Sequence, residues 1–387
     1  MIKKAAVTVY DAFLAVLFFG LMVLGYGVYS FLYPFYRFGR VFRIICLLFF
    51  TFAFMLLAGY LLMNYEARQK RTDRDYSETI LRVNKGSTLD DITALLTQYG
   101  IIDAPLQFKL VAALKGASKR MKAGSYVFNT QMSIQEIIDR IATGKTFSTR
   151  ISIPEGSTSF QIAALLQERL GVDSAAFMAA VNDTVLAASL GIRSPSLEGF
   201  LFPETYRFEW RADPRFIAAA MVRRFGEVWY RNQPPHLSVR RYRREQIVTM
   251  ASIVEAEAIV ASERPLIAGV FYNRLKKGMP LGADPTVRYA LQKYAGRQLT
   301  KSDLAVASPY NTRKFKGLPP GPIGNPGEAA IWAALNPIVT PMLYFVAKYD
   351  GTYGHYFSAT HEEHTRSKKQ SRENSRIRAL EKTEQRG

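Results

Sequence analysis

The sequence predicts an α+β protein with one or more transmembrane segments at its N-terminus. Two observations lead to this class. Long uncharged apolar runs occupy most of the chain before residue 64, and the remainder alternates short apolar strand patterns, Gly turns and capped amphipathic helices. With 387 residues, of which 48% are hydrophobic, the chain has room for two or three domains with sizeable cores.

The apolar runs are residues 12–36 and 44–63, and neither contains a charged residue. Each is long enough to cross a bilayer, which takes about 20 residues. No small-residue cleavage site follows the second run, so we expect retained anchors. Basic residues flank the runs on every side, so the positive-inside rule does not fix their orientation. With two spans and an exported C-terminal body, both ends would face outward and residues 37–43 would stay in the cytoplasm.

The formal net charge of +19 fits a nucleic acid, an anionic membrane surface or an acidic polymer as partner. The basic residues are spread along the chain and accompany no recognisable nucleic-acid module, so nucleic acid is not a predicted partner. The one cysteine, Cys46, lies inside the second apolar run. The rest of the chain therefore cannot form a disulfide or a cysteine-based metal site.

After a polar juxtamembrane linker at residues 64–78, the chain contains an internal repeat. LRVNKGSTLDDITALL (81–96) and ISIPEGSTSFQIAALL (151–166) share a Gly-Ser-Thr triplet and a following Ile-x-x-Leu-Leu. Each copy predicts a short strand, a Gly turn and a Ser/Thr-capped helix. The first copy continues through a second helix, a strand at residues 124–128 and a helix that is capped by Ser133 and ends at Gly144.

Residues 151–244 are predicted to form a mostly helical connector that includes the motif LEGFLFPETYRF. Glu204 in this motif either lines a ligand cleft or caps the helix or turn that follows Pro203.

A carboxylate in an apolar helix is the most informative feature of the chain. A helix over residues 248–258 would place Glu257 within an apolar stripe and Glu255 near its edge. A carboxyl group against apolar neighbours keeps its proton near neutral pH and can act as an acid catalyst. The alternative is that Glu257 forms a structural ion pair with Arg264 or another cation. Glu255 is the expected salt-bridge or hydrogen-bond partner. The stripe consists of Ile247, Met250, Ile253, Val254 and Ala258.

A second helix is predicted to start near Ser262 and Pro265 and to end at Gly278. Glu263 and Arg264, in the joint between the two helices, are either first-turn residues or cleft residues that fix Glu257. Further on, Asp284 precedes a proline and is predicted to be a helix N-cap.

Residues 308–327 contain too many Pro and Gly for a regular element and predict an ordered loop or flap. Tyr310, Asn311 and Thr312 in this loop would supply a stacking ring and hydrogen bonds to a ligand. The alternative is an Asx turn with Tyr310 packed inward.

Residues 343–349 and 355–358 predict a β-hairpin, and the charged tail after His361 predicts a surface helix or a frayed end. His355, His361 and His364 raise the question of zinc. Because zinc sites usually need three or four well-placed ligands and no cysteine is available, no metal site is predicted.

Five ordered motifs carry a resemblance to a known family. The motifs resemble those of the endolytic murein transglycosylase (MltG/YceG-like) family, and the match extends from about residue 78 to residue 364. They are ASIVEAEA, SERPLIAGVFYNRLKKGMPLGADPTVRYAL, SPYNTRKFKGLPPGPIGNPG, AALNP and YFVAKYDGTYGHYFSATHEEH.

The resemblance implies a lytic transglycosylase, a lyase that cleaves the β-1,4 bond between N-acetylmuramic acid and N-acetylglucosamine of nascent peptidoglycan and leaves 1,6-anhydro ends. Glu257 matches the family's catalytic acid/base, and no metal or organic cofactor is needed. The repeat-containing unit matches the family's LysM-like domain, a fold associated with N-acetylglucosamine-containing glycans. The expected substrate-binding residues are Glu204, Glu255, Glu263, Arg264, Asn273, Asp284, Thr286, Tyr310, Asn311 and Thr312.

The implied location is the inner (plasma) membrane, with the catalytic domain on the periplasmic or outer face. The expected partners are peptidoglycan glycan strands, the membrane and, by family analogy, the membrane-bound peptidoglycan synthases known as penicillin-binding proteins. Typical members have one span, so the run at residues 12–36 departs from the pattern. The expected domains are an anchor and linker (1–77), a LysM-like domain (78–147), a helical connector (148–244), a mixed α/β catalytic domain with a C-terminal β-hairpin (245–365) and a charged tail (366–387).

Two other functions stay open from the sequence. One is a muramidase-type hydrolase in which Glu257 works with a second acid, namely Glu255, Glu263 or Asp284. The other is a non-catalytic scaffold that binds glycan.

Overall fold

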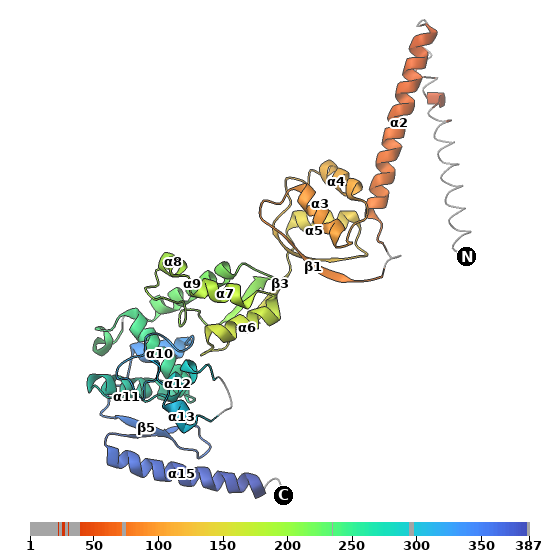
Figure 1. The fold of residues 1–387 in the computed structure, drawn as a ribbon. Helices are drawn as coiled ribbons and strands as arrows, with labels where there is room; N and C mark the ends of the chain where they lie inside the picture. Colours follow the sequence, from red (N-terminus) through yellow and green to blue (C-terminus); the bar gives the residue numbers. More distant parts are fainter. Residues whose placement is uncertain are drawn as a thin grey trace. The chain divides into compact units, whose positions relative to one another are not determined.

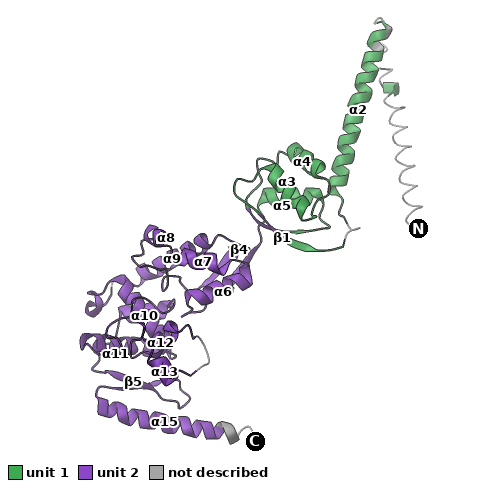
Figure 2. Cartoon of the chain, in the orientation of Figure 1, with its two compact units in different colours: residues 1–79, 83–123, 127–145 green, residues 80–82, 124–126, 146–387 purple. Residues whose placement is uncertain are grey.

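The computed structural model describes residues 22, 25–27, 30, 39–71, 75–233, 235–293 and 298–384 (Figure 1). The first apolar run, residues 12–36, lies almost entirely outside the described residues. The chain divides into two compact units (Figure 2). Unit 1 comprises residues 1–79, 83–123 and 127–145, and unit 2 comprises residues 80–82, 124–126 and 146–387.

The second apolar run forms most of helix α2 (Arg40–Arg68). In the described part of the chain, this is the one helix long and apolar enough to cross a membrane, over residues Ile44–Arg68. The helix continues past residue 64, into the predicted linker, and ends at Arg68. Its last turn holds Ala67, which is only 1% exposed because the end of α2 packs against α4 (Pro105–Leu114) and α5 (Ile134–Thr143).

The elements between α2 and residue 146 are those predicted from the first repeat copy. Thr88 caps α3 and Ser133 caps α5, each through a reciprocal capping box. Gly86 and Gly144 adopt positive φ angles of 86° and 74°, which a side chain would disfavour. These elements are β1 (Glu78–Val83), α3 (Leu89–Gln98), α4, β2 (Gly124–Asn129) and α5, with β1 paired to β2.

The second repeat copy opens the larger part of unit 2. Gly156 has a φ of 75°, and Thr158 caps α6 through a capping box, as the repeat predicts. Strand β3 pairs antiparallel with β4, with Ser148 opposite Glu209 and Ser152 opposite Thr205. The elements are β3 (Ser148–Ser152), α6 (Ser159–Leu170), α7 (Ser174–Val181), α8 (Thr184–Ser189), β4 (Thr205–Glu209) and α9 (Pro214–Arg231).

The C-terminal part of unit 2 surrounds helix α10 (Arg244–Glu257), which packs against α14 and α11. Strands β5 and β6 pair antiparallel, with Tyr344 opposite Ser358, and α15 packs along both strands (Figure 1). The remaining elements are η2 (Leu237–Val239), η3 (Ala261–Glu263), α11 (Arg264–Lys276), α12 (Asp284–Ala290), α13 (Lys301–Leu304), α14 (Glu328–Leu335), β5 (Tyr344–Ala347), β6 (His355–Ser358) and α15 (His361–Glu384).

Two local predictions for this part fare differently. The second helix is confirmed, because α11 has Pro265 in its first turn and is followed by Gly278 with a φ of 63°. The N-cap prediction for Asp284 is wrong. Ala283 is the N-cap of α12, without a side-chain capping bond, and Asp284 is the first helical residue. Its carboxylate instead accepts a hydrogen bond from Arg313 Nε at 2.6 Å.

Candidate active site

Glu257 is the last residue of α10, with Ala258 as the C-cap. The predicted apolar stripe understates the surroundings of this helix, because every residue from Ile247 to Val254 is buried. Burial on all sides, rather than on one face, fixes the helix and therefore the position of its end. The carbonyl end of a helix carries partial negative charge, which disfavours an ionised carboxylate there.

Glu257 lines a cavity of about 500 Å³ in unit 2, within the usual range for small-ligand sites. We call it the Glu257 cavity. Its wall combines α10, α11, the start of α12, the loop after α13, the β5–β6 hairpin and α15. Its polar and aromatic lining residues are Glu257, Arg274, Asp284, Arg313, Tyr344, Phe345, Tyr349, His355, His361, His364 and Lys368.

Burial is the main cause that raises the pKa of Glu257 to about 7, and the carboxylate of Asp284 raises it further. Arg274, Arg313 and a hydrogen bond from the backbone amide of Asp284 lower it, but they do not cancel the effect of burial. A glutamic acid with this pKa is protonated in about half of the molecules at neutral pH. It can therefore donate a proton and later accept one, as general acid/base catalysis requires.

The structural alternative for Glu257 was an ion pair with Arg264 or another cation, and in the structure Arg264 pairs with Glu255. Arg264 Nη2 lies 2.9 Å from Glu255 Oε1, and the backbone amide of Gly327 donates to Glu255 Oε2 at 2.9 Å. The prediction that Glu255 is a salt-bridge partner is confirmed. Because its side chain is only 6% exposed and both oxygens are engaged, Glu255 fixes the Gly327 backbone and does not line the cavity.

Glu263 also has a partner inside the protein. Its Oε2 accepts from His355 Nδ1 at 2.7 Å, and its Oε1 accepts from the His355 backbone amide at 2.9 Å. Glu263 thus orients a histidine that lines the cavity, although Glu263 itself does not. Asn273 is used in a similar way, because its amide donates to the carbonyls of Thr340 and Met342 and holds the segment before β5.

The loop residues predicted to touch a ligand are turned inward. Asn311 is fully buried, and its amide donates to the carbonyls of Leu304 and Val306, while its Oδ1 accepts from the Arg313 backbone amide. Thr312 is buried and lies 2.9 Å from Thr286 Oγ1, which is itself buried. This is the Asx-turn alternative rather than the binding one.

Tyr310 completes that inward arrangement. Its ring packs against Tyr289, with the ring centroids 4.9 Å apart, and it does not line the Glu257 cavity. The loop therefore positions the cavity wall through Arg313 and leaves its other predicted contacts inside the fold.

Glu204 lies outside the Glu257 cavity and has a partner of its own. The chain after Pro203 continues into strand β4, so there is no helix for Glu204 to cap. Its carboxylate pairs with Arg224, with Nη2 3.1 Å from Oε1, and it is not part of the Glu257 cavity.

Of the predicted site residues, the structure brings only Glu257 and Asp284 to the cavity wall. The sequence reasoning missed Arg274, Arg313, Tyr344 and Lys368, and considered the three histidines only as metal ligands. Arg274 had one usable signal, since it is a cation within an otherwise apolar segment of the predicted second helix, three residues after the buried Phe271. No local pattern marks Lys368, which lies on a charged helix far along the chain.

Comparison with known proteins agrees with this architecture. The model of the YceG-like family matches residues 81–370. The chain belongs to the YceG-like family. A curated relative from Bacillus subtilis, named endolytic murein transglycosylase, is 35% identical over 313 residues, which cover 76% of this chain and 85% of the relative. A Streptococcus pneumoniae protein of the same name is 30% identical, with 74% of this chain and 57% of that protein covered.

A solved structure is similar as well. The crystal structure of a yceG-like protein from Listeria monocytogenes shares 34% sequence identity with this chain, with a TM-score of 0.50. The match covers 76% of this chain and 99% of that one.

Proposed function

We propose that this protein is an endolytic murein transglycosylase that cleaves the glycan strands of peptidoglycan. The relatives that carry this name support the activity, and the mixed α+β fold is that of their family. The observation that carries the proposal is the position of Glu257. It is a carboxyl group with a pKa of about 7, placed by the end of a buried helix at the wall of a cavity that a sugar can enter.

In the proposed reaction Glu257 donates its proton to the glycosidic oxygen between N-acetylmuramic acid and N-acetylglucosamine as that bond breaks. The C6 hydroxyl of the muramic acid residue then attacks its own C1, and Glu257 takes up the hydroxyl proton. The product is a 1,6-anhydro ring, so no water is consumed and one carboxyl group serves in both steps. The positive charges of Arg274 and Arg313 stabilise the ionised form of Glu257 between the two steps.

The hydrolase alternative requires a second carboxylate near Glu257. Among the described residues, Asp284 is the other carboxylate that lines the cavity, whereas Glu255 and Glu263 are bound to Arg264 and His355. Asp284 forms an ion pair with Arg313, which favours its role as a charged wall residue over that of a free base.

Mass spectrometry of digested glycan strands tests the proposal. The wild type should release fragments with 1,6-anhydro ends, which lack the water that a hydrolase adds. Glu257→Gln should reduce the rate by about two to four orders of magnitude, the usual contribution of general acid/base catalysis. Fragments with ordinary reducing ends would favour the hydrolase, and a folded Gln variant with near-normal activity would exclude Glu257 as the catalyst.

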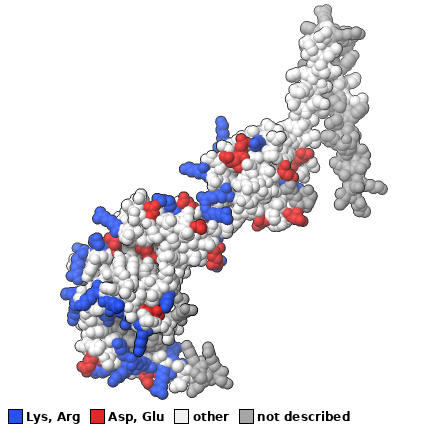
Figure 3. Space-filling view, viewed as in Figure 1, with Lys and Arg blue, Asp and Glu red and all other residues white. Residues whose placement is uncertain are grey.

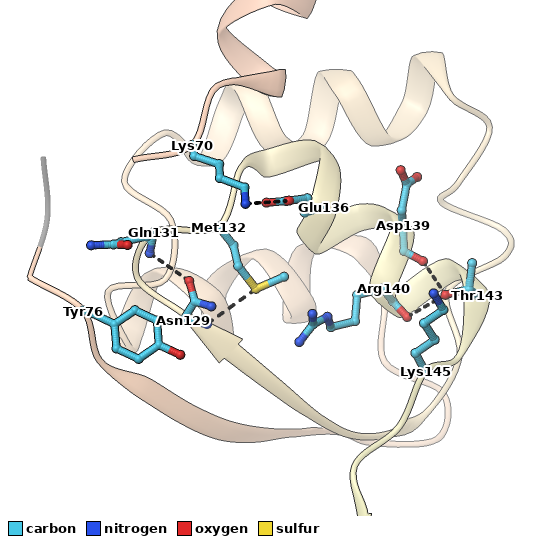
Figure 4. Close-up of a pocket in the computed structure, with 10 residues that line it drawn as sticks. All are labelled: Lys70, Tyr76, Asn129, Gln131, Met132, Glu136, Asp139, Arg140, Thr143 and Lys145. Carbon is cyan, nitrogen blue, oxygen red and sulfur yellow. Dashed lines mark hydrogen bonds and ion pairs between the residues drawn. The ribbon is translucent and has the colours of Figure 1, made fainter. Parts of the chain in front are cut away.

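We also propose that unit 1 is a LysM-like module that holds the glycan strand. Unit 1 contains a cavity of about 470 Å³ whose lining includes Tyr76, Asn129, Gln131 and Arg140 (Figure 4). An aromatic ring, two amides and a guanidinium are side chains that suit sugar hydroxyl and acetamido groups. Lys70 and Glu136, with charged atoms 4.0 Å apart, flank the same cavity.

The proposed location is the plasma membrane, with α2 as an anchor and unit 2 on the outer side, where peptidoglycan lies. A membrane-held enzyme acts on strands as they are made, which places it beside peptidoglycan synthases. Family analogy supports this partnership.

A further inference from the structure

The Glu257 cavity carries more fixed positive charge than its own acids balance. Arg313 is paired with Asp284. Arg274 has no carboxylate partner among the described residues. Its Nε donates to the carbonyl of Leu343 at 2.6 Å and its Nη1 to that of Leu281 at 2.5 Å, so backbone carbonyls rather than a carboxylate hold the guanidinium in place.

Helix α15 adds three more groups to the same wall. His361, His364 and Lys368 follow one another at spacings of three and four residues, which places them on one face of the helix. All three line the cavity with Arg274. Lys368 forms no ion pair with any acid in the part of the chain that the structure describes. Lys and Arg side chains are numerous on the visible face of unit 2 near α15 (Figure 3). We call Arg274, His361, His364 and Lys368 the cationic wall.

A buried polar atom in this wall lacks a partner. His364 is 7% exposed, its ring stacks on Tyr344 with centroids 4.9 Å apart, and its Nδ1 has no hydrogen-bond partner among the described residues. Burial, followed by the positive charges of Lys368, Arg274 and His361, lowers the pKa of His364 to about 4. The ring is therefore neutral at physiological pH, and the positive charges that act on it belong to the same wall. Buried polar groups are normally satisfied, and this nitrogen is covered by protein atoms, so the ring contributes to the wall by its face and not by an exposed donor.

We propose that the cationic wall binds a carboxylate group of the glycan strand while Glu257 acts on the neighbouring glycosidic bond. This inference rests on the proposed function and names a feature of its substrate. Arg274 and Lys368, which both line the cavity, would supply the positive charge and the N–H donors that suit a carboxylate. Two parts of a strand can offer one: the peptide stem, or the lactyl group of a muramic acid residue from which the stem has been removed.

Lys368 is the residue to change, because its side chain is exposed and forms no ion pair within the described residues. Lys368→Glu reverses the charge at the wall. Lys369→Glu makes the same change one position further along the exposed surface of α15, outside the cavity lining, and is the matched control. A charge-assisted hydrogen bond of ordinary strength corresponds to about a tenfold change in kcat/KM.

Three substrates, each assayed with the full-length protein, separate the effect of the strand's carboxylate charge from the effect of the rest of the strand. They are stem-bearing strands, the same strands after carbodiimide coupling of their carboxylates to methylamine, and amidase-treated strands with free lactyl carboxylates. The wild type and Lys369→Glu should cleave at least one charged substrate about tenfold better than the neutralised one. Lys368→Glu should lose that preference. Which charged substrate is preferred identifies the stem or the lactyl group as the source.

The inference is overturned if the wild type cleaves neutralised and charged strands equally well. It is also overturned if Lys368→Glu lowers kcat/KM by the same factor on all three substrates. A binding measurement separates it from the proposed function. In the Glu257→Gln background, calorimetry with stem-bearing and amidase-treated fragments should detect binding that salt weakens and that Lys368→Glu removes. Lys368-dependent binding without anhydro products from the wild type would refute the transglycosylase alone. Binding whose affinity is unchanged by Lys368→Glu would refute the carboxylate site, whether or not the wild type turns over the substrate.

Discussion

Replacing Glu257 by Gln should stabilise unit 2, and the gain should grow with pH. The folded protein raises the pKa of Glu257 from 4.5 to about 7. Below pH 4.5 the residue is protonated in both the folded and the unfolded chain, so its titration contributes nothing. Between pH 4.5 and about 7 the unfolded chain releases the proton while the folded protein keeps it, so stability falls as pH rises. Above about pH 7 both forms are ionised, and the full cost of the buried charge remains.

The magnitude follows from the size of the shift. A difference of about 7 minus 4.5, at about 1.4 kcal/mol per pH unit, gives a cost of about 3 kcal/mol at pH 8. Gln has nearly the same shape and no titration. The stability difference between Glu257→Gln and the wild type should therefore become more favourable to Gln by about 3 kcal/mol between pH 4 and pH 8.

Urea unfolding of the full-length protein in detergent micelles, followed by tryptophan fluorescence, measures this difference. Trp210, Trp229 and Trp332 are the three tryptophans of the chain, and all lie in unit 2. Glu373→Gln, at an exposed position of α15, is the control. Its stability relative to the wild type should be the same at pH 4 and pH 8. A Glu257→Gln effect that is the same at pH 4 and pH 8 would refute the raised pKa of Glu257.

Two further predictions concern stability. Gly269 and Gly226 both lie inside helices, but a Cβ at Gly269 would lie 2.3 Å from the carbonyl oxygen of Ile338, whereas one at Gly226 meets nothing within 4 Å. Gly269→Ala should destabilise unit 2 by about 1–3 kcal/mol in urea unfolding. Gly226→Ala should stabilise it by about 0.5–1 kcal/mol. Equal effects of the two substitutions would contradict the packing of α11 on the segment before β5. Glu198 is 5% exposed and accepts hydrogen bonds from the Ser159 backbone amide and hydroxyl and from the Asn325 amide. Glu198→Ala leaves these buried donors unsatisfied and should cost about 3 kcal/mol, and unchanged unfolding would show that water replaces the carboxylate.

The sequence predicted well those features that depend on neighbours in the chain. A strand, a glycine with positive φ and a Thr or Ser capping box occur within a few residues, so both repeat copies were readable, as was the Ser133-capped helix. Asp284 shows the limit of this approach. A one-residue difference in where α12 starts turned an expected cap into an ion-pair partner for Arg313.

The cavity wall was harder to predict because its members meet only through tertiary packing. Glu257 was predicted from the local pattern of the helix. The pairing of Arg264 with Glu255 depends on tertiary structure, because Glu255 also accepts a hydrogen bond from the backbone amide of Gly327, 72 residues further along the chain. Asn311 and Thr312 looked like ligand contacts because they are polar and lie in a loop. Their donors and acceptors are instead used to close that loop, which no single segment reveals.

Helix α15 supplies wall residues that come late in the chain, well after Glu257. A growing polypeptide that has already folded α10 still lacks one side of its cavity until α15 has been made and has docked on β5 and β6. An activity that depends on this cavity would thus appear only after α15 has docked, later than the folding of the helix that carries Glu257.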